Sequence, residues 1–137
     1  MKTLLYSLCF CLFSSTSIAQ DTTSVKTIKN LDANSKTAFF DLETGKELKE
    51  TDAWDLAFKA TTIKLNTNEA LKSKVAAQIV KSTTFEKLAK APETGYQQDT
   101  QSTSGIPSGS GNGWYTYDMG THQVLPIPDR VIIVKTS

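Results

Sequence analysis

The stretch from Gly113 to Val134 constrains the fold of this chain more than any other part of the sequence. Large aromatic residues come first, Asp118–Gly120 makes a turn, and apolar residues then resume. Aromatic and β-branched residues suit the half-buried surface of a sheet. Pro126 and Pro128 interrupt any ladder, because proline cannot donate a backbone hydrogen bond. The pattern predicts a strand, a turn and a second strand, followed by a third strand over residues 131–134.

The turn in this stretch carries Met119 and His122, which are the only methionine besides the initiator and the only histidine. Thioether and imidazole groups are ligands for soft metals and for haem iron. If the chain has a site with such ligands, we expect it here, with Tyr115 and Tyr117 as pocket walls. The alternative is that none of these residues binds a ligand. Met119 is then a partly exposed turn residue, His122 is solvated, and the tyrosine rings pack while their hydroxyls contact water.

Residues 1–19 have the pattern of a signal peptide. A positively charged start precedes an apolar stretch over 4–13, which is too short to span a bilayer, and Ser17–Ala19 is a small-x-small cleavage pattern. We expect cleavage after Ala19, rather than a short buried N-terminal helix. The mature protein is then exported, to the periplasm, the outer membrane or the exterior, and has no transmembrane segment.

The composition of residues 20–137 excludes several classes of function. Cys9 and Cys11 both lie in the signal peptide, so disulfides, thiolate metal sites and cysteine nucleophiles are excluded. The net charge of the whole chain is +1 and Lys2 is removed with the signal peptide, which leaves a balanced and dispersed charge. Nucleic acid and anionic membrane surfaces are therefore not expected partners. A single histidine, no nucleophile elbow and no phosphate-binding motif indicate that the protein is not an enzyme.

The first half of the chain predicts antiparallel strands. Residues 37–42 favour a strand, and residues 43–46 a turn in which Gly45 takes the positive φ. Residues 52–59 place large apolar residues at every second position, but the large residues after Ala60 follow the opposite parity. A bulge or a new strand near residues 60–62 explains that change.

The middle of the chain is less regular. Residues 75–80 are ambiguous between helix and strand. Thr83–Glu86 fits a capping box, which predicts a short helix over about residues 84–90. Residues 99–112 are rich in serine and glycine, which predicts a mobile loop.

Four motifs, in this order, resemble the HmuY family of bacterial envelope haem-binding proteins. They are Trp54–Phe58 with Thr62–Asn66, Ala77–Val80 with Thr84–Glu86, Ala91–Tyr96 with Asp99, and Gly113–Tyr115 through Pro126–Pro128 to Arg130–Thr136. The resemblance covers nearly the whole of residues 20–137. It implies one all-β domain whose antiparallel sheets grip a porphyrin between loop-like fingers, and it favours a strand over 75–80.

The resemblance also implies a ligand, haem, and an axial donor. Met119 occupies the position at which the family places one axial ligand, and His122 could substitute for the family's other donor. The family's second donor has no counterpart, because residues 99–112 contain no His, Met or Tyr. Met119 and His122 share one turn and cannot easily approach opposite faces of a ring. Five-coordinate binding, or a second donor from another copy, therefore remains open.

Family members continue beyond the equivalent of Lys135–Thr136 into further strands. A run of four β-branched residues over 131–134 also favours a buried strand with partners on both sides. We therefore expect a C-terminally incomplete domain, with C-terminal strands missing and an open edge on the last strand.

These observations leave three functional hypotheses. The first is a haem- or porphyrin-binding envelope protein involved in haem or iron acquisition, with an outer-membrane haem receptor as a candidate partner. The second is a β-rich envelope interaction module of the same fold without a cofactor. The third is a truncated and poorly stable family member.

Overall fold

The computed structural model describes residues 25–136, so the expected signal peptide, with Cys9 and Cys11, lies outside the described residues. Strands and single-turn 3-10 helices alternate with long loops. In chain order the elements are β1 (Ala38–Asp41), β2 (Lys46–Leu48), β3 (Leu56–Lys59), β4 (Thr62–Leu65), η1 (Glu69–Leu71), β5 (Ala76–Lys81), η2 (Phe85–Lys87), β6 (Tyr115–Asp118), β7 (Gln123–Pro126) and β8 (Arg130–Lys135).

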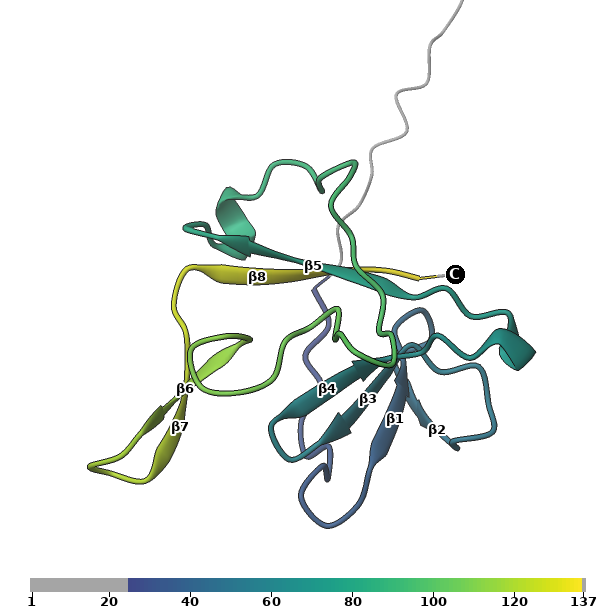
Figure 1. The fold of residues 1–137 in the computed structure, drawn as a ribbon, viewed down its shortest axis with the longest axis horizontal. Helices are drawn as coiled ribbons and strands as arrows, with labels where there is room; N and C mark the ends of the chain where they lie inside the picture. Colours follow the sequence, from purple (N-terminus) through teal and green to yellow (C-terminus); the bar gives the residue numbers. More distant parts are fainter. Residues whose placement is uncertain (1–24, 137) are drawn as a thin grey trace, which may run out of the picture.

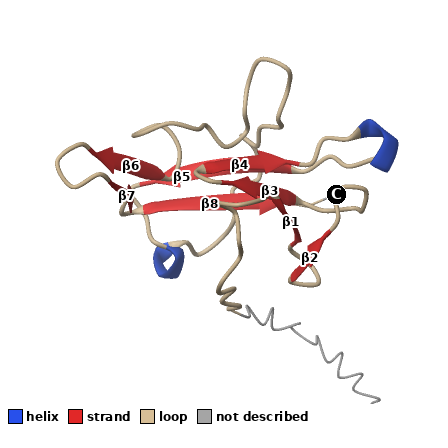
Figure 2. Cartoon of the chain, turned by 90° about the horizontal axis from the view of Figure 1, so that it is seen from below, coloured by secondary structure: helices blue, strands red, loops and turns tan. Residues whose placement is uncertain are grey.

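The predicted all-β fold with antiparallel sheets is confirmed. The strands form a four-stranded sheet in the order β2-β1-β3-β4, a two-stranded ribbon of β5 and β8, and a hairpin of β6 and β7. The four-stranded sheet and the hairpin lie on the same side of the ribbon but at opposite ends, and the hairpin projects from the body (Figure 1). The view from below also shows the hairpin at one end of the ribbon and the four-stranded sheet toward the other (Figure 2). Within residues 25–136 no helix has the length and apolar character needed to cross a membrane.

The expected change of parity after β3 is confirmed, and a new strand produces it. β3 and β4 form a tight hairpin in which Ala60 takes a positive φ of 48°. Leu56 then pairs with Leu65, and Phe58 pairs with Ile63. Paired residues of an antiparallel ladder lie on the same face, so the apolar side chains before and after the turn meet on one side.

The alternation of large residues over 52–59 begins before the strand itself. β3 begins only at Leu56, and Trp54 is half-buried in the segment before it. Its ring contacts Phe39 with centroids 5.1 Å apart, and its Nε1 donates to the carbonyl of Glu50 at 3.1 Å. Asp55 is also buried, so the alternation of residue size here does not mark one exposed and one buried face.

The core lies between the four-stranded sheet and the β5–β8 ribbon. Its buried residues come from both layers and from one loop, and partly buried side chains of β3, β4 and β8 pack against them. Burial of a leucine, isoleucine or valine side chain stabilises the fold by about 1.5–3 kcal/mol. The buried members are Leu56, Leu65, Val75, Ala77 and Ile106.

Residues 99–112 contain no strand or helix, as predicted, but the loop is packed against the body. Ile106 is only 2% exposed and belongs to the core. The Asp99 carboxylate accepts the N–H of Leu65 at 3.0 Å and the N–H of Gly105 at 2.8 Å, which joins the loop to β4. The prediction of a mobile loop therefore overlooked two anchors inside it.

The ambiguous segment 75–80 is strand β5, which pairs along its whole length with β8. The expected helix over 84–90 is only the 3-10 turn η2. The Thr84 side chain makes no capping hydrogen bond, and Phe85 is exposed. Without a cap or a packed apolar face, a longer helix has little to stabilise it.

β8 is half-buried over residues 131–134 rather than fully buried. It pairs with β5 along one edge. In the part of the chain that the structure describes, no strand pairs with the other edge.

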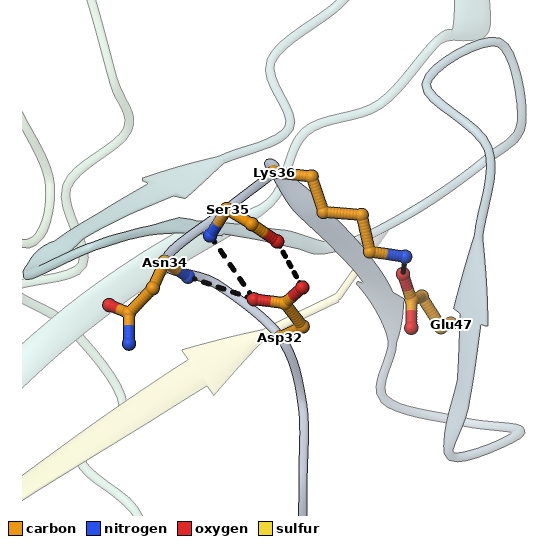
Figure 3. Close-up of polar contacts among 5 residues, drawn as sticks. All are labelled: Asp32, Asn34, Ser35, Lys36 and Glu47. Carbon is orange, nitrogen blue, oxygen red and sulfur yellow. Dashed lines mark hydrogen bonds and ion pairs between the residues drawn. The ribbon is translucent and has the colours of Figure 1, made fainter.

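Polar contacts fix the approach to β1 (Figure 3). The Asp32 carboxylate accepts the N–H groups of Asn34 at 3.3 Å and Ser35 at 3.1 Å, and the Ser35 hydroxyl also donates to it. The hydrogen bond from that hydroxyl is the main reason that the pKa of the Asp32 carboxyl is below its ordinary value. Lys36 forms an exposed ion pair with Glu47 at 2.6 Å, which links the start of β1 to β2.

Candidate functional site

The β6–β7 hairpin carries all four residues that the sequence predicts for a site. Tyr115 pairs with Pro126, and Tyr117 pairs with Val124. These pairs share one face of the hairpin, and Leu125 lies on the other face opposite Thr116. Tyr115 is buried at the root, whereas Tyr117 and Val124, nearer the turn, are each 40% exposed. One apolar face therefore runs from the body toward the tip.

The turn at the tip is fixed by Asp118. Its Oδ1 accepts the N–H groups of Gly120 at 2.8 Å and Thr121 at 3.1 Å. The N–H groups of Thr121 and Gly120 lower the pKa of the Asp118 carboxyl below its ordinary value. His122, which ends the turn, has a positive φ of 56°. An aspartate that bonds to the backbone two and three residues on is a common way to close a turn.

The structure brings Tyr117 and His122 together. The Tyr117 hydroxyl lies 2.8 Å from Nδ1 of His122, and the two ring centroids are 6.2 Å apart. Both residues are predicted site residues, but no sequence pattern predicts this contact. Because Tyr117 is on β6 and His122 ends the turn, the five-residue separation places them side by side only once the turn is closed.

Met119 lies at the tip and is 76% exposed. Half of the large apolar side chains that are exposed within residues 25–136 lie on this one hairpin. Tyr117 and Val124 share one face of the hairpin, Met119 is at the tip, and Leu125 lies on the other face.

The hairpin is anchored by long-range contacts that the sequence pattern does not predict. Nε1 of Trp114 donates to the carbonyl of Thr61 at 2.9 Å, and the Ser110 hydroxyl accepts the N–H of Tyr117 at 2.8 Å. The Arg130 guanidinium donates to the carbonyls of Asn112, at 3.2 Å, and Gly113. These contacts cross 7 to 53 positions of sequence, so no local pattern shows them.

Trp114 is half-buried just before β6, as Trp54 is just before β3, and these two strands belong to different sheets. The bond from Trp114 to Thr61 nevertheless ties the hairpin root to the β3–β4 turn.

Two open hollows lie near the start of β5, away from the hairpin. One has a volume of about 740 Å³ and is bordered by Lys72, Lys74, Tyr96 and Lys135. The other, about 1030 Å³, shares the first two lysines and is otherwise polar. Met119 lines neither of them. Within residues 25–136, no three His, Cys, Asp or Glu side chains gather as a metal site.

A family model described as HmuY protein matches residues 32–127. The chain belongs to the HmuY family. The matched range runs from the approach to β1 through the whole β6–β7 hairpin, and so includes Met119 and His122. HmuY proteins are haem-binding proteins of the cell envelope rather than enzymes. The searches of curated proteins and of solved structures each found no match.

Proposed function

We propose that this HmuY-family chain binds haem or a related porphyrin in the cell envelope and takes part in haem or iron acquisition. The observation that carries the proposal is the β6–β7 hairpin. It lies within the family-matched range and projects from the body, and its turn bears Met119 and His122. Haem iron in proteins is held by donors of these two kinds.

The residues of the hairpin fit haem in two respects. The turn offers a thioether and an imidazole, and the face beside it offers Tyr117 and Val124 as an exposed apolar surface for a flat ring. Tyr115 supports that face from its buried position at the root. Bound haem is the cargo that the protein would carry, and these side chains would hold it.

The hairpin supplies one axial donor, because Met119 and His122 belong to the same turn. Two donors must approach the iron from opposite ring faces, which one turn cannot easily achieve. The second axial position is then left to solvent or filled by another copy of the chain. The binding stoichiometry separates these arrangements, since sharing between copies gives one haemin for two chains.

We further propose that residues 1–19 are removed on export and that residues 20–137 act as one domain in the periplasm, at the outer membrane or outside the cell. An outer-membrane haem receptor is then the natural acceptor of the cargo. Co-purification of the haem-loaded protein with such a receptor tests this step separately from haem binding.

Titration of the full chain with haemin, followed at the Soret band, tests the proposal. We expect a saturable shift in the wild type that is lost in the double variant Met119→Ala/His122→Ala. Tyr96→Phe, which changes a phenol at the other end of the molecule, should bind as the wild type does. An unchanged shift in the double variant would contradict the assignment of the hairpin.

A thermal melt in the absence of haemin separates the remaining alternatives. A cooperative melt with no Soret shift indicates a β-rich interaction module that has kept the fold without the cofactor. The absence of a cooperative melt indicates a poorly stable family member. Both results would overturn the proposed function.

A further inference from the structure

The two candidate donors on the hairpin turn differ in how firmly they are held. Met119 is 76% exposed and has a flexible thioether side chain. The imidazole of His122 instead has Nδ1 2.8 Å from the Tyr117 hydroxyl and a ring contact with Tyr117. A donor whose ring is already oriented loses less freedom when it binds a ligand.

We infer that His122, through Nε2, is the residue of this turn that ligates haem iron, and that Tyr117 is its positioning residue. The inference rests on the proposed function. It departs from the resemblance, which implied Met119 as the axial donor.

The hydrogen bond determines which nitrogen is available. A neutral imidazole carries one proton, so an Nδ1–H that donates to the Tyr117 oxygen leaves the lone pair of Nε2 exposed. Metal-ligating histidines almost always donate their other ring N–H to an oxygen acceptor. The opposite arrangement, with the tyrosine as donor, puts the proton on Nε2 and prevents ligation. The proposal therefore specifies one tautomer, with the proton on Nδ1.

The hairpin also places the imidazole beside a residue of the apolar face. Tyr117 and Val124 are cross-strand partners whose side chains lie on the same face. The ring contact between Tyr117 and His122 brings the imidazole next to Tyr117, one residue of that face. An iron donor and an apolar surface are thus gathered at the end of one hairpin.

Ligand chemistry supports the same choice. Thioethers are soft donors that suit metals in low oxidation states, whereas imidazole suits iron and other borderline metals. Ferric haemin should therefore prefer His122. On this view Met119 contributes apolar surface at the tip, and its removal should leave ligation in place.

Haemin titrations of single variants of the full chain test the ligand. We expect His122→Ala to lose the Soret shift of the wild type and Met119→Ala to keep it. Tyr117→Phe should keep the ligand but weaken haemin binding by about tenfold, the usual effect of removing an outer partner of a ligating histidine. Tyr96→Phe is the control for loss of a phenol hydroxyl.

A second measurement tests the Tyr117–His122 pair without haem. His122 is the only histidine, so the imidazole nitrogen signals of a tag-free chain belong to it alone. At about pH 8, where an ordinary imidazole is neutral, nitrogen NMR should show the proton mainly on Nδ1. Tyr117→Phe should decrease that population, and Tyr96→Phe should not.

The outcomes separate this inference from the proposed function. No shift in the wild type would overturn both. A wild-type shift that survives in His122→Ala and disappears in Met119→Ala would leave the proposed function intact and overturn the inference. A haem-free spectrum with the proton on Nε2 in both wild type and Tyr117→Phe would overturn the positioning role of Tyr117.

Discussion

Nε1 of Trp114 donates a hydrogen bond to the backbone carbonyl of Thr61 at 2.9 Å, across 53 positions of sequence. Trp114 immediately precedes β6, and Thr61 lies in the turn between β3 and β4. The bond therefore connects the root of the projecting hairpin to the four-stranded sheet. The placement of the candidate donors depends on this connection as well as on the hairpin itself.

Trp114→Phe tests this connection. The substitution keeps an aromatic ring and removes the N–H, so we expect a loss of about 1 kcal/mol in the free energy of unfolding. Trp54→Phe is the matched control, because it also removes an indole N–H that donates to a carbonyl, within a segment remote from the hairpin. Both variants should lower the melting temperature, but only Trp114→Phe should shift the NMR signals of His122. Equal shifts in both would contradict the connection.

The Asp99 carboxylate holds the long loop to β4 through two backbone N–H groups. Asp99→Ala leaves both donors without this acceptor, and we expect it to destabilise the protein by about 2–3 kcal/mol. Asp99→Asn keeps one acceptor oxygen and should have an intermediate effect. Chemical denaturation measures these changes. Glu93→Ala, which removes an exposed ion pair with Lys90, should change stability by less than about 1 kcal/mol. A loss for Asp99→Ala as small as this control would disprove the bridging role.

Gly105 lies where the loop passes close to the body. A Cβ there would come within 2.4 Å of the Gln97 carbonyl oxygen and 2.5 Å of Leu65 Cδ1. Because one neighbour is backbone, Gly105→Ala should force a shift and cost about 1–3 kcal/mol. The adjacent, exposed Ser104→Ala should be near neutral. Equal melting temperatures for the two variants would show that the loop does not pack this closely.

Asp55 gives the protein a pH dependence of known sign. Burial raises the pKa of its carboxyl, the Leu42 N–H that donates at 2.8 Å opposes the rise, and the charge of Asp41 adds to it. The folded state therefore binds a proton more tightly than the unfolded chain. Asp55 contributes stability that is present below the unfolded pKa of about 3.9 and is lost as the pH rises through the folded pKa.

Asp55→Asn removes this titration and keeps an oxygen for the Leu42 N–H. We expect the melting temperature of the variant, minus that of the wild type, to increase as the pH is raised from about 3 to about 7. A difference that is constant or decreases over this range would contradict the raised pKa of Asp55.

The local sequence pattern predicted the parts of the fold in which the paired strands are neighbours in the sequence. The β3–β4 hairpin and the β6–β7 hairpin are formed by neighbours in sequence, so residue alternation and turn residues such as Asp118 are enough to define them. The same holds for the turn after β1, where Gly45 takes a positive φ of 69°.

The features that the sequence did not predict depend on contacts between segments that are distant in the sequence. Ile106 is a single apolar residue in a polar loop, and only the three-dimensional fold shows that it reaches the core. Trp54 fits a strand by alternation, but the strand begins two residues later. At the site, the sequence predicted Met119, His122, Tyr115 and Tyr117 as members of one site. It could not show that Tyr117 contacts His122 or that Arg130 supports the hairpin root.

The central claim is that the hairpin turn ligates the iron of a bound haem. The most direct measurement compares the affinity of the full chain for haemin with its affinity for the metal-free porphyrin. We predict that the wild type prefers haemin and that Met119→Ala/His122→Ala binds the two equally. The same preference for haemin in wild type and double variant would contradict the account, because the iron would then be ligated elsewhere.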